Sequence, residues 1–487
     1  MIKYHLERQV IFMARKSGVL MHISSLFGDY GTGSFGKNAE YFVDFLSDCG
    51  FSVWQVLPFN MVDEHNSPYK SYSSFSGNPY FVDLETLYND GLLTNEELNS
   101  ARQQSPWLCE FNILSEERFS LLKKASERVE NKREISKFIK SNPYIASFCE
   151  FMALKDANDG KEWQKWTVKK YDKSVHFAWQ FIQYEFFTQW AKIKKYANDK
   201  GIMIIGDVPI YVSEDSSDVW ANTKEFQLDS DGHPMNIAGV PPDYFCEDGQ
   251  LWGNPLYDWS EMKKNGYKWW CDRIKHMSLL FDGVRIDHFR GIESYWSVPA
   301  TAKTAKDGKW VKGPGMSLIK AIKEAAGKTM IIAEDLGDIT PAVNKLVKNS
   351  GFPGMRVFQF GFLSDGESTH MPHNYTDNCI AYTGTHDNNT LLGYLWELDD
   401  STREKMLFYC NHSGDWKTGC ESIIKTMLAS HADTIIMPIQ DLLGFGADTR
   451  INTPGRADGN WAYRITKEQL DSIDRKHFKF LNKMYYR

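Results

Sequence analysis

The sequence predicts an α/β fold, a (β/α)8 barrel with large insertions after its second and third strands and no C-terminal β-sandwich. Eight short apolar segments rich in β-branched residues recur along the 487-residue chain. Helix-like segments with capping residues separate several of them, as repeated βα units require. No GxGxxG follows the first segment, which disfavours the structural alternative, an open doubly wound sheet.

The eight predicted strands share one pattern, a short apolar run that ends in polar or glycine-rich sequence. Strands that alternate with helices form a parallel sheet, and eight such units close into a barrel. The predicted strands span residues 18–23, 51–59, 201–212, 281–289, 329–337, 354–362, 379–388 and 433–444.

Four segments carry the signals of helices. Residues 38–50 and 317–327 each begin with a capping side chain and stop at glycine. Residues 340–351 have proline just inside their start, where its missing N–H is tolerated. We expect residues 466–486 to form one final helix.

Two connections are too long for simple βα loops. Residues 60–200 are largely helical in pattern, and residues 213–270 are rich in Gly, Pro, Asp and Trp. Both follow strands, so both should lie at the C-terminal face of the barrel, where barrel enzymes carry their active sites. We expect one catalytic domain, residues 13–487. Residues 1–12 are then an N-terminal extension, or translation begins at Met13.

Composition excludes several functional classes. The net charge of −7 gives no basic footprint for nucleic acid or for a membrane surface. No apolar stretch approaches the roughly 20 residues of a membrane span, and residues 10–14 are too short a run for a signal peptide. The eight cysteines are scattered without a CxxC pair, as in a cytoplasmic protein with reduced thiols.

The predicted strand FDGVRIDHFRG, residues 281–291, carries charges where a buried strand should be apolar. Alternate residues of a barrel strand face the helices and the lumen. If Val284 and Ile286 face the helices, Arg285 and Asp287 share the lumen side near the end of the strand. Such a pair either contacts a substrate or is a buried ion pair that fixes the barrel.

Acidic side chains also stand at the ends of other predicted strands. Asp207 ends the third, Glu334 and Asp335 end the fifth, and His386 and Asp387 end the seventh. A carboxylate is costly to remove from water. Three or more acids that converge on one rim therefore favour catalysis over a lone structural ion pair.

Two carboxylates that flank a bond are the apparatus of glycoside cleavage. Asp287 shares its strand face with Arg285, which favours its ionised form, so it is the better nucleophile. Glu334 follows an apolar run and is the better acid/base. A metal site built with His386 is the rival hypothesis, but a lumenal arginine argues against a cation there.

These residues carry a resemblance. FDGVRIDHFRG, IIAEDLG and TGTHDN resemble the conserved blocks of the 4-α-glucanotransferases, also called amylomaltases or glycoside hydrolase family 77. Other stretches agree, and the similarity covers nearly the whole chain from Arg15 onward. They are GVLMHISSLFGDYGTGSFG, SPYKSYSSFSGNPYFVDL, GDVPIYVSEDSSDVW, GVPPDYFCEDGQLWGNPLYDW and NTPGRADGNW.

The resemblance implies roles for particular residues. Asp287 matches the family's nucleophile, Glu334 its general acid/base, and Asp387 the carboxylate that holds and distorts the sugar at the cleavage subsite. The other matches are Arg285 and His386 in contact with the same sugar, Asp207 in a supporting role, Tyr69 stacked on that sugar, and Trp252 in a mobile loop on the acceptor side. For Tyr69 and Trp252 the alternative is an ordinary loop aromatic without a role in binding.

The resemblance also implies a reaction. The protein would cleave α-1,4-glucans with retention and transfer the glucanyl chain to the 4-hydroxyl of an acceptor glucan or glucose. It would need neither cofactor nor metal, and its partners would be maltooligosaccharides and other α-1,4-glucans. An α-amylase-like retaining hydrolase and a non-enzymatic glucan binder are the alternatives.

Overall fold

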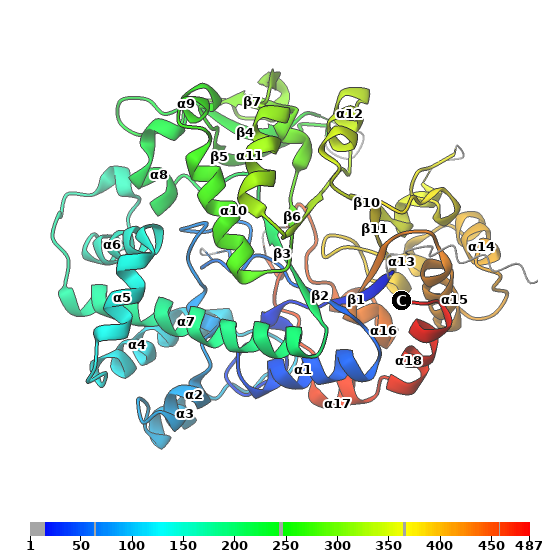
Figure 1. The fold of residues 1–487 in the computed structure, drawn as a ribbon, viewed down its shortest axis with the longest axis horizontal. Coiled ribbons are helices and arrows are strands. Elements are labelled where there is room, and N and C mark those ends of the chain that lie inside the picture. The colour runs from blue at the N-terminus through cyan, green and yellow to red at the C-terminus, as the bar shows by residue number, and fades with distance from the viewer. Residues whose placement is uncertain (1–14, 63–64, 243–246, 364–366, 457) are drawn as a thin grey trace, which may run out of the picture.

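Eight parallel strands close into a barrel at the centre of the molecule (Figure 1). Their order is β1-β12-β11-β10-β9-β6-β3-β2, so the predicted (β/α)8 barrel is confirmed. The computed structural model describes residues 15–62, 65–242, 247–363, 367–456 and 458–487. The barrel strands are β1 (Lys16–Leu20), β2 (Val53–Gln55), β3 (Met203–Val208), β6 (Gly283–Ile286), β9 (Met330–Ala333), β10 (Gly354–Val357), β11 (Cys379–Tyr382) and β12 (Thr434–Pro438).

Alternate side chains of the strands fall into two separate apolar clusters. Ile205 and Ile332 belong to a small cluster inside the barrel, together with Tyr382. Their neighbours Ile204 and Ile331 belong to the large cluster under the helices. This period of two places the polar residues at the strand ends on the lumen side.

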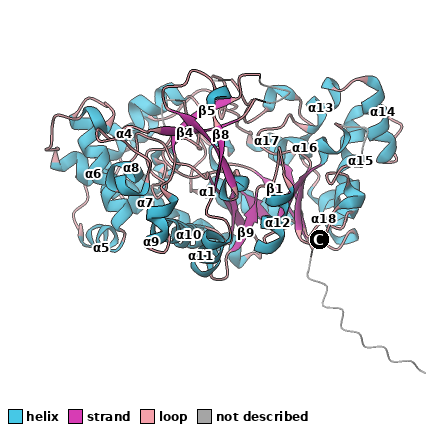
Figure 2. Ribbon diagram, turned by 90° about the horizontal axis from the view of Figure 1, so that it is seen from above, coloured by secondary structure: helices cyan, strands magenta, loops and turns pink. Residues whose placement is uncertain are grey.

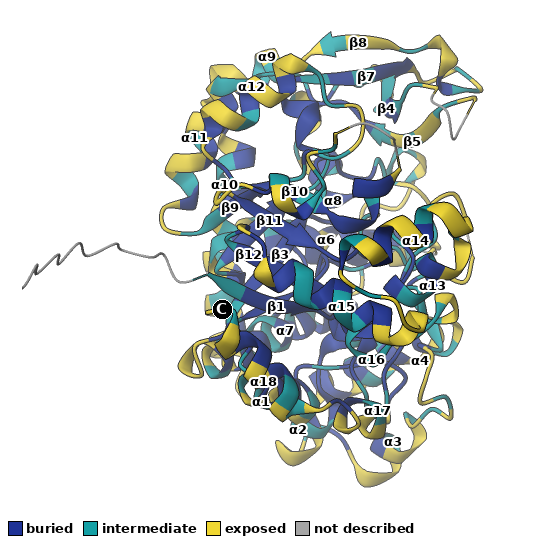
Figure 3. Ribbon diagram, turned by 90° about the vertical axis from the view of Figure 1, so that its right-hand side faces the viewer, coloured by how far each residue is buried: buried dark blue, intermediate teal, exposed yellow. Residues whose placement is uncertain are grey.

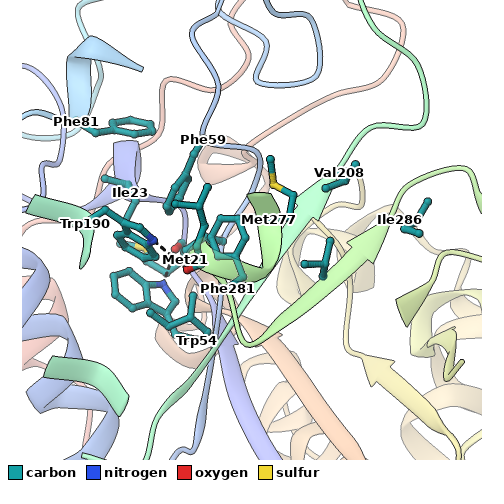
Figure 4. Close-up of a cluster of buried hydrophobic side chains, with 14 of the residues drawn as sticks. Met21, Ile23, Trp54, Phe59, Phe81, Trp190, Val208, Met277, Phe281 and Ile286 are labelled. Atoms are coloured by element: carbon teal, nitrogen blue, oxygen red, sulfur yellow. Dashed lines mark hydrogen bonds between the residues drawn. The ribbon is translucent and has the colours of Figure 1, made fainter. Parts of the chain in front are cut away.

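The large cluster is rich in aromatic side chains that fix the helices on the barrel (Figure 4). Trp190 of α7 donates its indole N–H to the carbonyl of Leu280 at 3.0 Å and packs on Phe59 at 4.6 Å between ring centroids. Trp54 donates to the carbonyl of Met21 at 2.7 Å. Figure 3 shows the barrel strands as mainly buried and the outer helical faces as exposed.

A run of helices connects β2 to β3. These helices lie on one flank of the molecule, and α13, α14 and α15 lie on the opposite flank (Figures 1 and 2). The division into one domain with two insertions stays a prediction, and residues 1–12 lie outside the described residues. The connecting helices are α2 (Leu84–Asn89), α3 (Asn95–Ser100), α4 (Phe111–Glu127), α5 (Arg133–Ser141), α6 (Pro143–Ala157) and α7 (Lys173–Asp199).

A second sheet, which the sequence did not predict, joins two connections of the barrel. It is antiparallel, in the order β5-β4-β7-β8. The hairpin of β4 (Asn236–Val240) and β5 (Gln250–Pro255) follows β3, and that of β7 (Ser294–Pro299) and β8 (Lys309–Lys312) follows β6. The expected loop around Trp252 is therefore wrong, because Trp252 lies in β5; residues 243–246 lie outside the described residues.

The other helices surround the barrel. Three predicted helices are confirmed as α1, α11 and α12. No helix among the described residues has the length and apolar character needed to cross a membrane. The bounds are α1 (Lys37–Asp48), α8 (Ser217–Ala221), α9 (Trp259–Lys264), α10 (Lys268–Leu280), α11 (Met316–Ala326), α12 (Pro341–Ser350), α13 (Leu391–Glu397), α14 (Asp400–Tyr409), α15 (Trp416–Ala429) and α16 (Ile439–Leu443).

The single final helix expected over residues 466–486 is wrong. The chain forms two helices there, α17 (Lys467–Asp471) and α18 (Arg475–Met484). Asp474 starts a new helix between them, because its carboxylate accepts the N–H of His477 at 3.0 Å as an N-cap. No strand follows β12 within the described part of the chain.

Candidate active site

Polar side chains that follow β6 and β11 line one open cavity of about 460 Å³. Five of the predicted site residues line it: Tyr69, Trp252, Asp287, His386 and Asp387. The other three, Asp207, Arg285 and Glu334, stand at the ends of β3, β6 and β9. The strand spacing thus brings the predicted residues to one rim.

Arg285 and Asp207 form a buried ion pair at the floor of this cavity. The Arg285 Nε donates to Asp207 Oδ1 at 2.9 Å, and Nη2 donates to Oδ2 at 2.6 Å. Burial opposes the charge of Arg285, but Asp207 and Asp287 raise its pKa well above the usual value. A guanidinium held by two parallel bonds is fixed in direction as well as in charge.

Asp287 contacts the same guanidinium nitrogen that donates to Asp207 Oδ2. The distance between its Oδ1 and Arg285 Nη2 is 2.9 Å, and 32% of its side chain is exposed. Burial raises the pKa of Asp287 to about 8, and the carboxylates of Asp207 and Glu334 add to this rise, which Arg285 opposes without cancelling. The expected order, with the pKa of Asp287 below that of Glu334, is therefore not found in the cavity without substrate. The sequence left two hypotheses for Arg285, a buried structural ion pair and a contact with a substrate. Its ion pair with Asp207 agrees with the first, and its contact with Asp287, which lines the cavity, is compatible with the second.

Glu334 is held by backbone N–H groups. The His288 N–H donates to Glu334 Oε2 at 2.7 Å, and the Leu336 N–H donates to Oε1 at 2.8 Å. His288 has φ 49°, a left-handed conformation that is uncommon for a residue other than glycine. Burial raises the pKa of Glu334 to about 7, although Arg285 and the two N–H groups lower it.

Asp387 is the most exposed of the three acids, with 46% of its side chain accessible. Asn452 donates its amide to Asp387 Oδ1 at 2.6 Å, and Arg450 donates to the Asp387 carbonyl at 3.0 Å. His386 Nε2 lies 3.2 Å from Asp387 Oδ2. Burial lowers the pKa of His386, which favours a neutral imidazole beside the cavity.

Aromatic rings form one wall of the cavity. Tyr69 stacks on His386 with 5.1 Å between the ring centroids, and Trp461 packs against both rings. The Tyr69 hydroxyl donates to Asp207 at 2.5 Å and accepts from Arg285 at 3.1 Å. One face of Tyr69 is thus covered by His386, and its hydroxyl belongs to the polar floor.

Trp252 forms part of the opposite wall. Its ring packs edge-on against His288, with 4.8 Å between the centroids. Its indole N–H donates to Gln250 at 3.1 Å. Trp252 therefore lies next to the segment that holds Glu334, on a strand rather than on a loop.

Asp335 is not part of this group, although the sequence placed it among the acids of the rim. Its carboxylate accepts the Met355 N–H at 2.6 Å and pairs with Arg356 at 3.3 Å. Sequence reasoning in turn singled out neither Asn452 nor Trp461. Both lie in the block NTPGRADGNW, where neither residue carries a local sequence signal of its role.

The described residues contain no cluster of three or more His, Cys, Asp or Glu that could hold a metal ion. The acids of the cavity are instead balanced by a guanidinium, backbone N–H groups and an amide. This set of partners suits an organic ligand whose bond is cleaved by carboxyl groups.

Comparison with known proteins points to one family. A family model described as 4-alpha-glucanotransferase matches residues 21–470. The 4-alpha-glucanotransferase of Streptococcus pneumoniae is 45% identical over 478 residues, covering 94% of each chain. That of Thermus thermophilus is 39% identical, covering 94% of this chain and 96% of the other.

Solved structures agree. The amylomaltase of Streptococcus agalactiae, solved in complex with acarbose, superposes with a TM-score of 0.93 at 39% identity. The match covers 97% of this chain and 99% of that one. The amylomaltase of Corynebacterium glutamicum, 16% identical with a TM-score of 0.81, shares the fold. The chain therefore belongs to the 4-alpha-glucanotransferase family.

Proposed function

We propose that this protein is a 4-α-glucanotransferase, which cleaves α-1,4-glucans with retention and transfers the released chain to another glucan or to glucose. The observation that carries the proposal is the pair Asp287 and Glu334. They lie at the ends of adjacent barrel strands, and each is held in place by a different set of donors. Family membership supports the same reaction.

The first step forms a glycosyl-enzyme. Asp287 attacks the anomeric carbon, and Glu334 gives its proton to the departing glycosidic oxygen. The contact with Arg285 stabilises the charge of Asp287 until the bond forms. A pKa near 7 leaves a large fraction of Glu334 protonated at neutral pH.

The second step reverses the roles. Glu334, now ionised, takes the proton of an acceptor 4-hydroxyl, and that oxygen displaces Asp287 from the anomeric carbon. Both protons move through carboxyl groups, so the scheme balances without a cofactor or a metal. Asp387 and His386 hold the hydroxyls of the sugar whose bond breaks, with Arg285, Tyr69 and Asp207 beneath them.

Transfer requires that an acceptor sugar, and not water, reaches the glycosyl-enzyme. Trp252 and the ring of His288 form a wall on which an acceptor sugar can pack. A sugar bound there would keep water away from the glycosyl-enzyme. This favours transfer over the hydrolase alternative. Maltooligosaccharides and longer α-1,4-glucans are the substrates proposed, and the cytoplasm is the proposed location.

The test is to incubate the protein with maltotriose and resolve the products by chain length over time. Glucose together with chains longer than maltotriose is the expected result, because hydrolysis cannot lengthen a chain. Only glucose and maltose would overturn the transferase proposal in favour of a hydrolase. Binding of maltotriose without any product would indicate a glucan-binding protein.

A further inference from the structure

The loop that carries Asp387 is closed at its base by the buried carboxylate of Asp441. Asp441 lies in α16 and is 4% exposed. Its Oδ2 accepts the hydroxyl of Thr383 at 2.5 Å, and its Oδ1 accepts the N–H of Leu391 at 2.7 Å. Thr383 directly follows β11 and Leu391 begins α13, so the two bonds bracket residues 384–390.

This carboxylate has no cationic partner. No Lys, Arg or His of the described segments forms an ion pair with Asp441. Burial raises its pKa to about 6, although the Thr383 hydroxyl and the Leu391 N–H lower it. A folded pKa above the unfolded one means that ionised Asp441 destabilises the fold at neutral pH. What holds Asp441 in place is therefore its two hydrogen bonds, to Thr383 and to Leu391, and not an opposite charge.

The neighbouring residue, Gln440, supports the other side of Asp387. Its amide donates to the Thr449 carbonyl at 2.9 Å. The segment that begins there supplies Arg450 and Asn452, the two residues that hold the carbonyl and the carboxylate of Asp387. Two consecutive side chains of α16 therefore anchor both segments that meet at Asp387.

The interior of the loop leaves little room for adjustment. The amide of Gln359 donates to the Asn389 carbonyl at 2.8 Å. A Cβ placed on Gly384 would lie 2.7 Å from that same amide nitrogen, so a larger residue there would have to displace the Gln359 side chain. With its interior packed in this way, the loop can shift as a whole only if its base opens.

We propose that Asp441 is a positioning residue of the glucan-transfer reaction: it ties Thr383 to Leu391 and so fixes where Asp387 meets the sugar. This inference rests on the proposed function and deepens it. Asp441 is not among the residues that line the described cavity, so it acts through the loop. A shift of about 1 Å at a substrate-holding group can cost about 100-fold in rate.

The test uses a matched pair at Thr383. Thr383→Val keeps the shape but removes the donor, which leaves one oxygen of Asp441 unpaired; Thr383→Ser keeps the hydroxyl. We expect kcat/KM for maltotriose to fall about 10- to 100-fold in Thr383→Val and to stay within about threefold in Thr383→Ser. Unchanged kcat/KM in folded Thr383→Val protein would overturn the proposal.

A control at the other end of the barrel separates positioning from stability. The buried hydroxyl of Ser17 donates to Asn482 at 2.6 Å. Ser17→Ala removes a comparable buried hydrogen bond far from the loop, and we expect a lower Tm with kcat/KM unchanged. An equal loss of activity in Ser17→Ala and Thr383→Val would show that lost stability, not a displaced loop, is the cause.

A double-mutant cycle tests whether the effect passes through Asp387. We expect Thr383→Val to weaken the affinity for acarbose about tenfold in the wild-type background, measured by titration calorimetry. In an Asp387→Ala background we expect no further loss, because there is no carboxylate left to place. The same fold-loss in both backgrounds would contradict positioning.

Asp441→Asn is a second variant that keeps the proposal testable if Thr383→Val does not fold. An asparagine can still accept from Leu391 and can donate to Thr383, so the tie persists without the charge. We expect kcat/KM within about threefold of wild type and a higher Tm. If kcat/KM fell as far in Asp441→Asn as in Thr383→Val, the charge of Asp441 would be the cause, and the proposal that its hydrogen bonds position the loop would be overturned. Wild-type protein that never lengthens maltotriose would instead overturn the proposed function itself.

Discussion

The two sides of the cleft hold their acids by different means. On the strand side, Asp287 and Glu334 are fixed by Arg285 and by backbone N–H groups next to the barrel strands. On the loop side, Asp387 is fixed by the side chain of Asn452, 65 residues further along the chain. The exposed fraction follows the same division, with 46% of Asp387 and 32% of Asp287 accessible.

The difference teaches where rigidity is needed. A nucleophile and an acid/base must be aligned with the bond that breaks, and backbone and ion-pair contacts provide that alignment. Asp387, whose proposed role is to hold the sugar, is more exposed and depends on a side chain from a distant segment, Asn452.

Replacement of Asp287 by Asn should have the largest effect. The nucleophile is lost while the shape and the contact with Arg285 remain, so kcat should fall on the order of 10⁴-fold or more. Chain-length analysis with maltotriose measures the loss, and Asp377→Asn, which changes an exposed acid outside the cavity, is the control. An active Asp287→Asn protein would remove this residue from the role of nucleophile.

The acid on the neighbouring strand should govern the alkaline pH limit. Glu334 must carry a proton in the first step, and burial raises its pKa to about 7. Asp287 must be ionised in the same step, and its pKa is raised to about 8. We therefore expect kcat/KM to be highest between about pH 7 and 8 and to fall about tenfold per pH unit above pH 8, where Glu334 has lost the proton that it donates. Initial rates from pH 5 to 9 measure this limb. With a donor such as maltosyl fluoride, whose leaving group needs no proton, Glu334→Gln should still release fluoride in the first step, although transfer to the acceptor should stay slow because the base of the second step is missing.

On the loop side, Asn452→Ala should have an intermediate effect. It removes the 2.6 Å hydrogen bond to Asp387 and leaves that carboxylate free to rotate. We expect kcat/KM to fall about tenfold, in proportion to one lost bond to a charged group. Steady-state rates with maltotriose and the affinity for acarbose should decline together. A fall as large as that of Asp287→Asn would mean that the two sides are equally rigid.

The smallest effect should come from Trp252→Ala on the acceptor wall. Loss of the indole removes an apolar surface next to His288 and should weaken acceptor binding by about 1 kcal/mol, or roughly fivefold in KM for the acceptor. Water should then compete better, so the ratio of glucose released to chain lengthened should rise. Trp310→Ala, on the outer strand β8, is a matched control that should change neither quantity.

The residues on the strand side of the site could be predicted from the sequence, but the residues that support Asp387 on the loop side could not. Arg285 and Asp287 were assigned to one face from the period of two alone, and their 2.9 Å contact agrees. The contacts of Asp387 with Arg450 and Asn452 depend on how a late segment folds back, which no local pattern encodes.

The same reasoning explains the errors of the fold prediction. The period of two and the capping signals are local, and they located all eight barrel strands. The antiparallel sheet is formed by pairing between residues 236–240 and residues 294–299, which come from two different connections. The break between α17 and α18 did carry a local signal, the capping Asp474, which the helical pattern on either side obscured.

The antiparallel sheet limits how its two hairpins can be deleted or exchanged, both in engineering and in evolution. Because β4 pairs with β5 on one edge and with β7 on the other, neither hairpin can be shortened or grafted alone. Removing β7 and β8 would expose a row of unpaired N–H and C=O groups along β4, which is a template for aggregation. The two hairpins should therefore be lost, gained or exchanged together, as one module that spans two neighbouring connections of the barrel.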